Sequence, residues 1–174
     1  KVARMRCLIA VAMVSALVLS ALNSPAFGQA GDLFPLGTDS QRQDDVPKGT
    51  VTKHVWKSTV FEGTFREYYL YVPHQYSEDK PASVMVFQDG HAYVGETGDF
   101  RVPIVFDNLI HQKRMPVTVG IFINPGHKSE EFPENRWRAD NRSFEYDTLS
   151  DQYSRFLLDE ILPEVSKSVR LSES

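Results

Sequence analysis

The chain contains one cysteine, Cys7, and it lies within the first thirty residues. Residues 31–174 therefore contain no cysteine, so no disulfide can form within them and their stability must come from a packed core. The sequence also lacks an excess of positive charge, since its net charge at pH 7 is −4. This balance excludes the basic surface that is typical of nucleic-acid-binding proteins, and we expect no nucleic-acid partner.

Long apolar runs are also scarce. One run, Cys7–Leu22, is almost wholly apolar; it follows three basic residues and precedes several small ones. This order is typical of a secretory signal peptide, so we expect residues 1–30 to be one, cleaved at Ala26 or Ala30. The protein is then exported to the periplasm or the cell exterior. A transmembrane anchor is the alternative, but the run is short for a span, and we expect no stable membrane anchor.

Two catalytic patterns are missing. The side chains of Asp89, His91, Asp99 and His127 are a conceivable metal site, but their spacing matches no ligand motif such as H-E-x-x-H. We therefore expect no metal and no cofactor. No serine has glycine at both the −2 and the +2 position, so the G-x-S-x-G elbow that carries the nucleophile of many hydrolases is missing as well.

The first half of the domain predicts an arm and a hairpin. Residues 31–50 are rich in Gly, Pro, Asp and Gln, and we expect a flexible arm there. Residues 51–60 and 66–72 each predict a strand, and the turn signal Glu62–Gly63 between them indicates an antiparallel hairpin. The tyrosines of the second strand resemble a sugar-binding stripe, but packing within a half-buried sheet is the favoured interpretation.

The second half predicts strands that alternate with helices. Residues 83–87 and 117–123 are apolar runs of the kind found in strands buried on both faces, and a helix is expected from Pro103 to about His111. A final helix is expected from an N-cap at Thr148, through Leu149 and on to Val169, with a kink at Pro163. This alternation predicts an α/β fold: an antiparallel hairpin that leads into a parallel sheet with flanking helices.

Several polar residues directly follow the predicted strand 83–87. Ligands bind at the carboxyl ends of strands in open α/β sheets, which makes Asp89, Gly90, His91 and Tyr93 candidate site residues. His127 follows the next buried strand and is a weaker candidate to line the same cleft. The alternative is that Asp89 and Gly90 form an ordinary turn without a ligand.

Four segments together resemble the esterase family related to enterochelin esterase, a branch of the α/β-hydrolases: YYLYVPHQY, VMVFQDGHAYV, MPVTVGIFINPGH and NRSFEYDTLSDQYSRFLLDEILPEV. The resemblance runs from about Pro47 to Arg170. It implies that residues 51–174 are the N-terminal portion of an α/β-hydrolase domain, with an incomplete sheet. The family hydrolyses esters with a Ser–Asp–His triad whose serine follows the EILPEV helix, so we expect this chain to be truncated before its nucleophile and inactive.

The resemblance also implies roles for individual residues. The main-chain N–H groups of Gly90 and His91 would form one side of an oxyanion hole, with Asp89 and Tyr93 at its rim. Arg142 and Glu145 would lie near the same rim, and they would pair with each other if that turn were helical. The alternative for these two is a solvated ion pair at the surface, without a functional role.

The expected function is that of an exported serine esterase. Its substrate would be a small-molecule or carbohydrate ester: an ester of a carbohydrate, a siderophore or a similar polar acyl compound. A non-catalytic glycan-binding module is one alternative, with the tyrosine-rich hairpin and Trp56 as its platform. An acyltransferase of the same fold is another.

Overall fold

The computed structural model describes residues 35–172, so the predicted signal peptide and its cleavage sites lie outside the described residues. Four strands form one mixed sheet in the order β1-β2-β4-β3. Their bounds are Thr50–Lys57 (β1), Phe65–Val72 (β2), Ser83–Gln88 (β3) and Thr118–Ile123 (β4). β1 and β2 form the antiparallel hairpin, β2 runs antiparallel to β4, and β3 and β4 are parallel. The predicted α/β architecture is confirmed.

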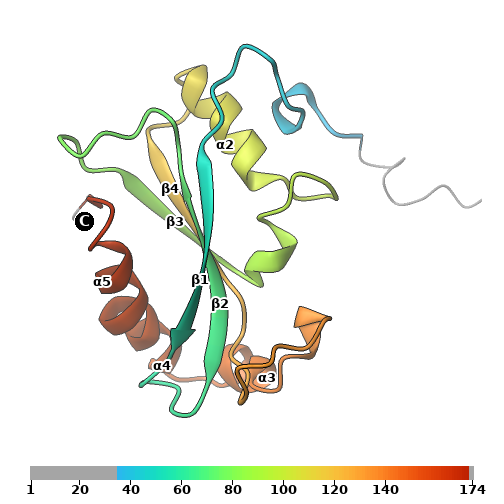
Figure 1. Ribbon diagram of the computed structural model, residues 1–174, viewed down its shortest axis with the longest axis vertical. Helices are drawn as coiled ribbons and strands as arrows, with labels where there is room; N and C mark the ends of the chain where they lie inside the picture. The colour runs from blue at the N-terminus through green and yellow to red at the C-terminus, as the bar shows by residue number, and fades with distance from the viewer. Residues whose placement is uncertain (1–34, 173–174) are drawn as a thin grey trace, which may run out of the picture.

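Helices cover both faces of the sheet. Helix α2 lies on one face, and a continuous helical segment of α4, η4 and α5 lies on the other (Figure 1). Shorter elements connect the strands to these helices or lie between them. The bounds are Val102–His111 (α2), Arg142–Asp147 (α3), Gln152–Arg155 (α4), Phe156–Ile161 (η4), Leu162–Val165 (α5), Thr38–Ser40 (η1), Gly90–Ala92 (η2) and Arg136–Arg138 (η3).

The alternation of side chains along β2 divides the core in two. Tyr68 and Leu70 pack against the final helical segment, whereas Tyr71 faces α2 together with Phe106 and Phe122. Tyr71 and Phe122 are fully buried, and Tyr68 is only 4% exposed. The hairpin tyrosines therefore serve sheet packing, because successive residues of a strand point to opposite faces.

Strand β3 is less buried than the sequence predicts. All six residues of β4 are buried, but β3 lies at the edge of the sheet, and its Met85 is 43% exposed. Just before β3, Ala82 forms a parallel bridge with Leu171: the Ala82 N–H donates to the carbonyl of Arg170 (2.9 Å), and the Ser172 N–H donates to the carbonyl of Ala82 (2.8 Å).

The final helix begins later and ends earlier than predicted. Thr148 is the C-cap of α3 rather than an N-cap, and Leu149 is fully exposed, so the predicted start is wrong. The helix begins at Gln152 and adopts π-helical hydrogen bonding over Phe156–Ile161, one turn before Pro163. A widened turn is a common way to accommodate a disrupted hydrogen-bond ladder. Val169 lies beyond the helix yet is buried in the core.

The described part of the predicted arm contacts α2. The Gly49 N–H donates to Asp107 Oδ1 (2.8 Å), and Arg42 forms an ion pair with the same carboxylate. The Asn108 side chain donates to the carbonyls of Asp39 and Gln41. These contacts tie residues 39–49 to the helix, and the mobility of the segment 31–50 stays a prediction. Among residues 35–172, no helix has the length and apolar character needed to cross a bilayer.

Candidate functional site

The turn after β3 is held in an unusual conformation. Asp89 has φ 53° and ψ 44°, which is the left-handed region that non-glycine residues rarely adopt. Gly90 then lies directly against β4, where a Cβ atom would come within 2.5 Å of the Ile123 main-chain nitrogen. Only glycine fits this close approach without a shift of the backbone. The turn is therefore fixed by packing at the carboxyl ends of two parallel strands.

Arg142 clamps this turn. From the first residue of α3, its Nε and Nη2 atoms donate to the two carboxylate oxygens of Asp89 at 2.8 and 2.7 Å. Such a bidentate pair fixes both distance and orientation. The predicted pairing of Arg142 with Glu145 is wrong, because each of the two side chains forms a bidentate pair with a residue far away in the sequence.

Glu145 instead pairs with Arg66 of β2 in the interior. Arg66 donates to both carboxylate oxygens of Glu145 at 2.7 and 2.9 Å, and neither side chain has any exposed surface. The same carboxylate accepts from Asn141 Nδ2 (2.7 Å) and from the Gly126 N–H. Its oxygens are thus fully used within the protein. Glu145 supports the loop after β4, and its complete burial does not fit the substrate-binding position that was predicted for it near the rim.

His91 contacts a residue that the sequence analysis did not single out, Asn124, which directly follows β4. Asn124 Oδ1 accepts from the His91 N–H (2.9 Å) and lies 3.0 Å from His91 Nδ1. The His91 and Trp137 rings also meet nearly at right angles, with ring centroids 4.6 Å apart. One of the two predicted oxyanion donors is therefore already occupied. Among residues 35–172, no group accepts a hydrogen bond from the Gly90 N–H.

The other two predicted residues lie outside this cluster. The half-buried Tyr93 ring packs between Phe87 and Phe100, at centroid distances of 5.4 and 4.7 Å, against the core cluster that includes Phe106 of α2. His127 pairs with Phe65 through its main chain, and its Nδ1 lies 3.1 Å from Asp140 Oδ1. The role of Tyr93 at the rim and that of His127 in the cleft stay predictions.

The alternative of a metal site at Asp89, His91, Asp99 and His127 is not supported by the structure. Within the part of the chain that the structure describes, no three His, Cys, Asp or Glu side chains are close enough together to hold a metal ion.

Aromatic side chains complete the cluster. The Arg142 guanidinium lies 5.2 Å from the ring centres of both Trp137 and Tyr146, and the Asp89 N–H donates to the Tyr146 hydroxyl at 3.4 Å. Burial raises the pKa of Tyr146, and it raises the pKa of Tyr153 beside it to about 12. Both phenols are therefore neutral at pH 7. No sequence pattern marked Trp137, Tyr146 or Asn124, because each lies in or beside an irregular segment.

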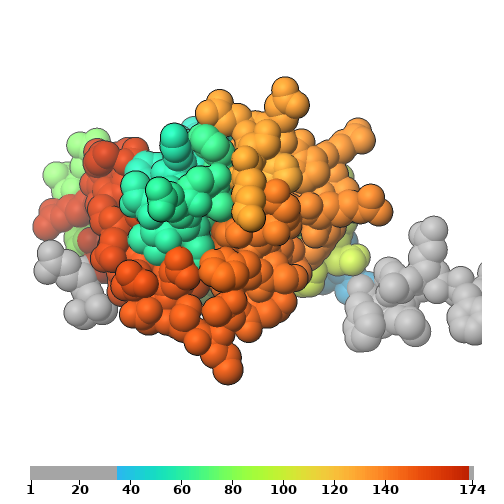
Figure 2. All heavy atoms as spheres, turned by 90° about the horizontal axis from the view of Figure 1, so that it is seen from below, coloured from blue at the N-terminus to red at the C-terminus, as the bar shows by residue number. Residues whose placement is uncertain are grey.

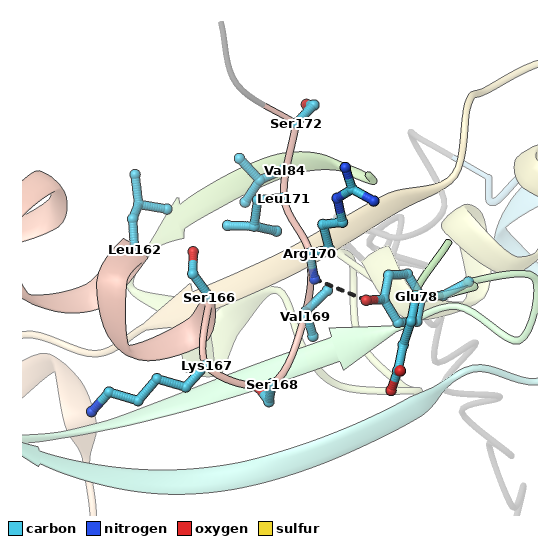
Figure 3. A pocket seen from close by; sticks show the side chains of 11 residues that line it. Glu78, Val84, Leu162, Ser166, Lys167, Ser168, Val169, Arg170, Leu171 and Ser172 are labelled. Atoms are coloured by element: carbon cyan, nitrogen blue, oxygen red, sulfur yellow. Dashed lines mark hydrogen bonds between the residues drawn. The ribbon is translucent and has the colours of Figure 1, made fainter. Parts of the chain in front are cut away.

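This end of the molecule is covered by residues 124–150. Figure 2 shows the segment in orange, spread over the surface beside the turn of the β1–β2 hairpin. Two pockets, of about 610 and 510 Å³, lie at the other end of the sheet, where β3 and β4 begin. Leu162, Val84 and Leu171 group together in the larger one (Figure 3). Neither pocket is lined by a predicted site residue.

The chain has esterases among its structural neighbours. It is similar to the CE1 ferulic acid esterase AmCE1/Fae1A from the anaerobic fungus Anaeromyces mucronatus, with TM-score 0.55 and 17% identity over 79% of this chain and 50% of that chain. The same enzyme in complex with ferulic acid gives TM-score 0.55 and 18% identity, over 79% and 49%. This chain spans about half the length of these structures. The likeness shows a shared fold.

One of two sequence comparisons identifies the family. A search of curated protein sequences gives no significant match. The family model described as "Putative esterase" matches residues 58–174, which is more than half of the chain and includes the whole cluster around Asp89. The chain belongs to this esterase family.

Proposed function

We propose that this chain forms the oxyanion side of an exported serine esterase. The observation that carries the proposal is the turn Asp89–His91, fixed at the end of β3 by Arg142 and by close packing on β4. A rigid main-chain N–H at this place can stabilise the negative oxygen that develops when an ester is attacked. The Gly90 N–H is the better candidate donor, since the His91 N–H already donates to Asn124.

The proposed substrate is an ester of a carbohydrate, a siderophore or a similar polar acyl compound. Two structures of similar fold are described as a ferulic acid esterase, one with ferulic acid bound, which supports a hydroxylated aromatic acid as the acyl group. In the complete enzyme, a serine would form a covalent acyl intermediate with this group. Export is supported by the order of basic, apolar and small residues in 1–30.

The proposed inactivity of this chain has a direct test. Because no serine lies in a G-x-S-x-G elbow, we expect the purified 174-residue chain to hydrolyse p-nitrophenyl acetate no faster than its heat-denatured control. Turnover that a fluorophosphonate abolishes would show that a nucleophile is present after all.

The location of ligand binding tests the proposed function against a glycan-binding module. Tyr68 and Tyr71 are buried, and the Trp56 indole donates to Glu160, which leaves the hairpin little aromatic surface to offer a sugar. We therefore expect ferulic acid to shift the amide resonances of the ¹⁵N-labelled chain at residues 89–91. Shifts confined to the hairpin with a xylo-oligosaccharide would favour the binding module. An acyltransferase shares the oxyanion site and would differ in its acyl acceptor.

A further inference from the structure

The side-chain amide of Asn124 has one chemically allowed orientation. One end of the amide faces the His91 N–H at 2.9 Å, and the other end faces Glu67 Oε2 at 3.4 Å. A main-chain N–H can only donate a hydrogen bond, and an ionised carboxylate can only accept one. Both neighbours independently require that the oxygen of the amide points to His91 and the NH₂ group to Glu67.

Glu67 is well placed to act as a pure acceptor. Its side chain is 4% exposed and forms ion pairs with Arg136, at 2.6 Å, and with Lys53. Burial alone would raise the pKa of Glu67, but the hydrogen bonds and charges of Arg136 and Lys53 outweigh burial and lower it. The carboxylate is therefore ionised at neutral pH, and it holds the Asn124 amide in place.

This orientation fixes the tautomer of His91. Its Nδ1 atom lies 3.0 Å from the Asn124 oxygen, which can only accept, so Nδ1 must carry the proton. In the neutral ring, Nε2 is then a bare acceptor. Nε2 is buried and has no hydrogen-bond partner among residues 35–172. Buried acceptors are seldom left unpaired, so this atom points to a missing donor.

We propose that His91 Nε2 accepts a hydrogen bond from a ring hydroxyl of the substrate, next to the turn that binds the ester oxygen. The inference rests on the proposed function and names a specificity contact within the same site. A hydroxyl matches a neutral acceptor, and it requires no second charged or metal-binding group. Trp137, which is 52% exposed, offers a flat apolar surface to the ring that carries the hydroxyl.

Trp137 must move for this contact to form. Its ring lies against the His91 ring, with centroids 4.6 Å apart, and the Arg142 guanidinium lies 5.2 Å from its centre, while His91 Nε2 itself is buried. Trp137 lies on the short turn η3, where its main-chain N–H donates a hydrogen bond to Asn135 Oδ1 (3.1 Å). An aromatic side chain on a short surface turn can be displaced without disturbing the sheet.

The tautomer is tested first, in the ligand-free chain. Long-range ¹H–¹⁵N spectra of the ¹⁵N-histidine-labelled chain distinguish protonated from bare ring nitrogens. We expect a bare Nε2 and a protonated Nδ1 for His91, and a mixture of tautomers after Asn124→Ala. A protonated Nε2 in the neutral ring of the wild type would overturn the inference.

Ligands with and without a hydroxyl test the contact itself. Phenolic and sugar hydroxyls are separated by two titrations, ferulic acid against 3,4-dimethoxycinnamic acid and methyl xyloside against its fully O-methylated form. We expect one hydroxyl ligand to shift His91 Nε2, to bind about tenfold more weakly to His91→Phe, and to bind normally to the control His111→Phe. The tenfold loss corresponds to about 1.4 kcal/mol, the size of one hydrogen bond.

The outcomes separate the two proposals. If a hydroxyl ligand shifts the amides of residues 89–91 but leaves Nε2 unchanged, or if the methylated ligands bind equally well, the His91 contact is wrong and the esterase site stands. If no ligand perturbs residues 89–91, the proposed function fails and the contact fails with it. Amide dispersion in the same spectra confirms that each variant is folded.

Discussion

Two arginine–carboxylate pairs meet at helix α3, and they differ in burial. Arg66 and Glu145 have no exposed side-chain surface, whereas the Arg142 and Asp89 side chains are 33% and 12% exposed. Both pairs are bidentate, with distances between 2.7 and 2.9 Å. The chemistry is the same, so burial decides what each pair does.

The buried pair organises the fold. Arg66 lies over the Phe156 ring at 4.1 Å, and Glu145 binds the Gly126 N–H, so the pair joins β2, the final helical segment and the loop after β4. The Arg142–Asp89 pair holds one turn at the candidate site. The comparison teaches that a fully buried ion pair is needed for the stability of the whole fold, while a partly exposed pair sets the local geometry of one turn.

Breaking the buried pair should have the largest effect. Glu145→Gln keeps the volume of the side chain but leaves the Arg66 charge buried without a counterion. We expect a loss of about 3–5 kcal/mol in the free energy of unfolding, measured by urea denaturation. The matched control is Glu164→Gln, which breaks an exposed pair with Lys167 and should cost less than about 1 kcal/mol. Equal losses in both variants would contradict the comparison.

Glu160 is a buried carboxylate that has no ion pair with any basic residue of the segment 35–172. It accepts hydrogen bonds from five groups of the β1–β2 hairpin and the turn after β1: Trp56 Nε1, Ser58 Oγ, Thr59 N–H, Thr59 Oγ1 and Val60 N–H. Burial opposes ionisation, but these bonds outweigh it and lower the pKa of Glu160 to about 2.

The second prediction follows from this shift. A folded-state pKa below the ordinary value of 4.5 means that ionised Glu160 stabilises the fold above pH 4.5. This contribution, up to about 3 kcal/mol, should be lost as the pH falls from 4.5 to about 2. Glu160→Gln should lose about 2–3 kcal/mol at pH 7 and show a flatter acid limb in urea unfolding measured at several pH values. An unchanged acid limb would show that other carboxylates dominate.

The order of strands and helices could be predicted, because it follows from the spacing of apolar residues and from the positions of turn-forming residues. The hairpin, the parallel pair β3 and β4, and the helix that begins beside Pro103 all follow such local signals. The edge position of β3 is not encoded locally, since an apolar run does not reveal how many neighbours a strand has. The predicted start of the last helix is wrong because threonine is a typical N-cap residue, whereas Thr148 is the C-cap of the preceding helix α3.

The position of the candidate site could be predicted from the sequence, but the hydrogen-bond and ion-pair partners within it could not. Its place after β3 follows from the strand and its Asp-Gly turn. The pairing of Arg142 with Glu145 failed because helical spacing says only that two side chains share a face. Their true partners lie 53 and 79 residues away in the chain. Asn124 was missed for the same reason: a polar residue at a strand end gains meaning only when His91 lies beside it.

A third prediction concerns the packing that holds the turn against β4. Gly90→Ala would place a Cβ atom 2.5 Å from the Ile123 main-chain nitrogen, so the turn must shift away from the sheet. We expect a loss of about 1–3 kcal/mol and shifted amide resonances at residues 89–91. Gly37→Ala is the matched control, because nothing lies within 4 Å of its added methyl group. If both variants unfold at the same urea concentration, the close approach does not constrain the turn.

The smallest loss of stability is expected for Arg142→Lys, and comparing it with Arg66→Lys tests how the two arginines differ. Lysine keeps the charge but cannot form a bidentate pair, so Arg142→Lys should cost less than about 1 kcal/mol while releasing Asp89 from its left-handed conformation. The His91 amide, which depends on the turn, should then exchange its hydrogen about three- to fivefold faster. Arg66→Lys should show the reverse: a larger loss of global stability, because a buried ammonium replaces two of its hydrogen bonds poorly. If Arg142→Lys left exchange at His91 unchanged, the clamp would not govern the turn, and burial alone would account for both pairs.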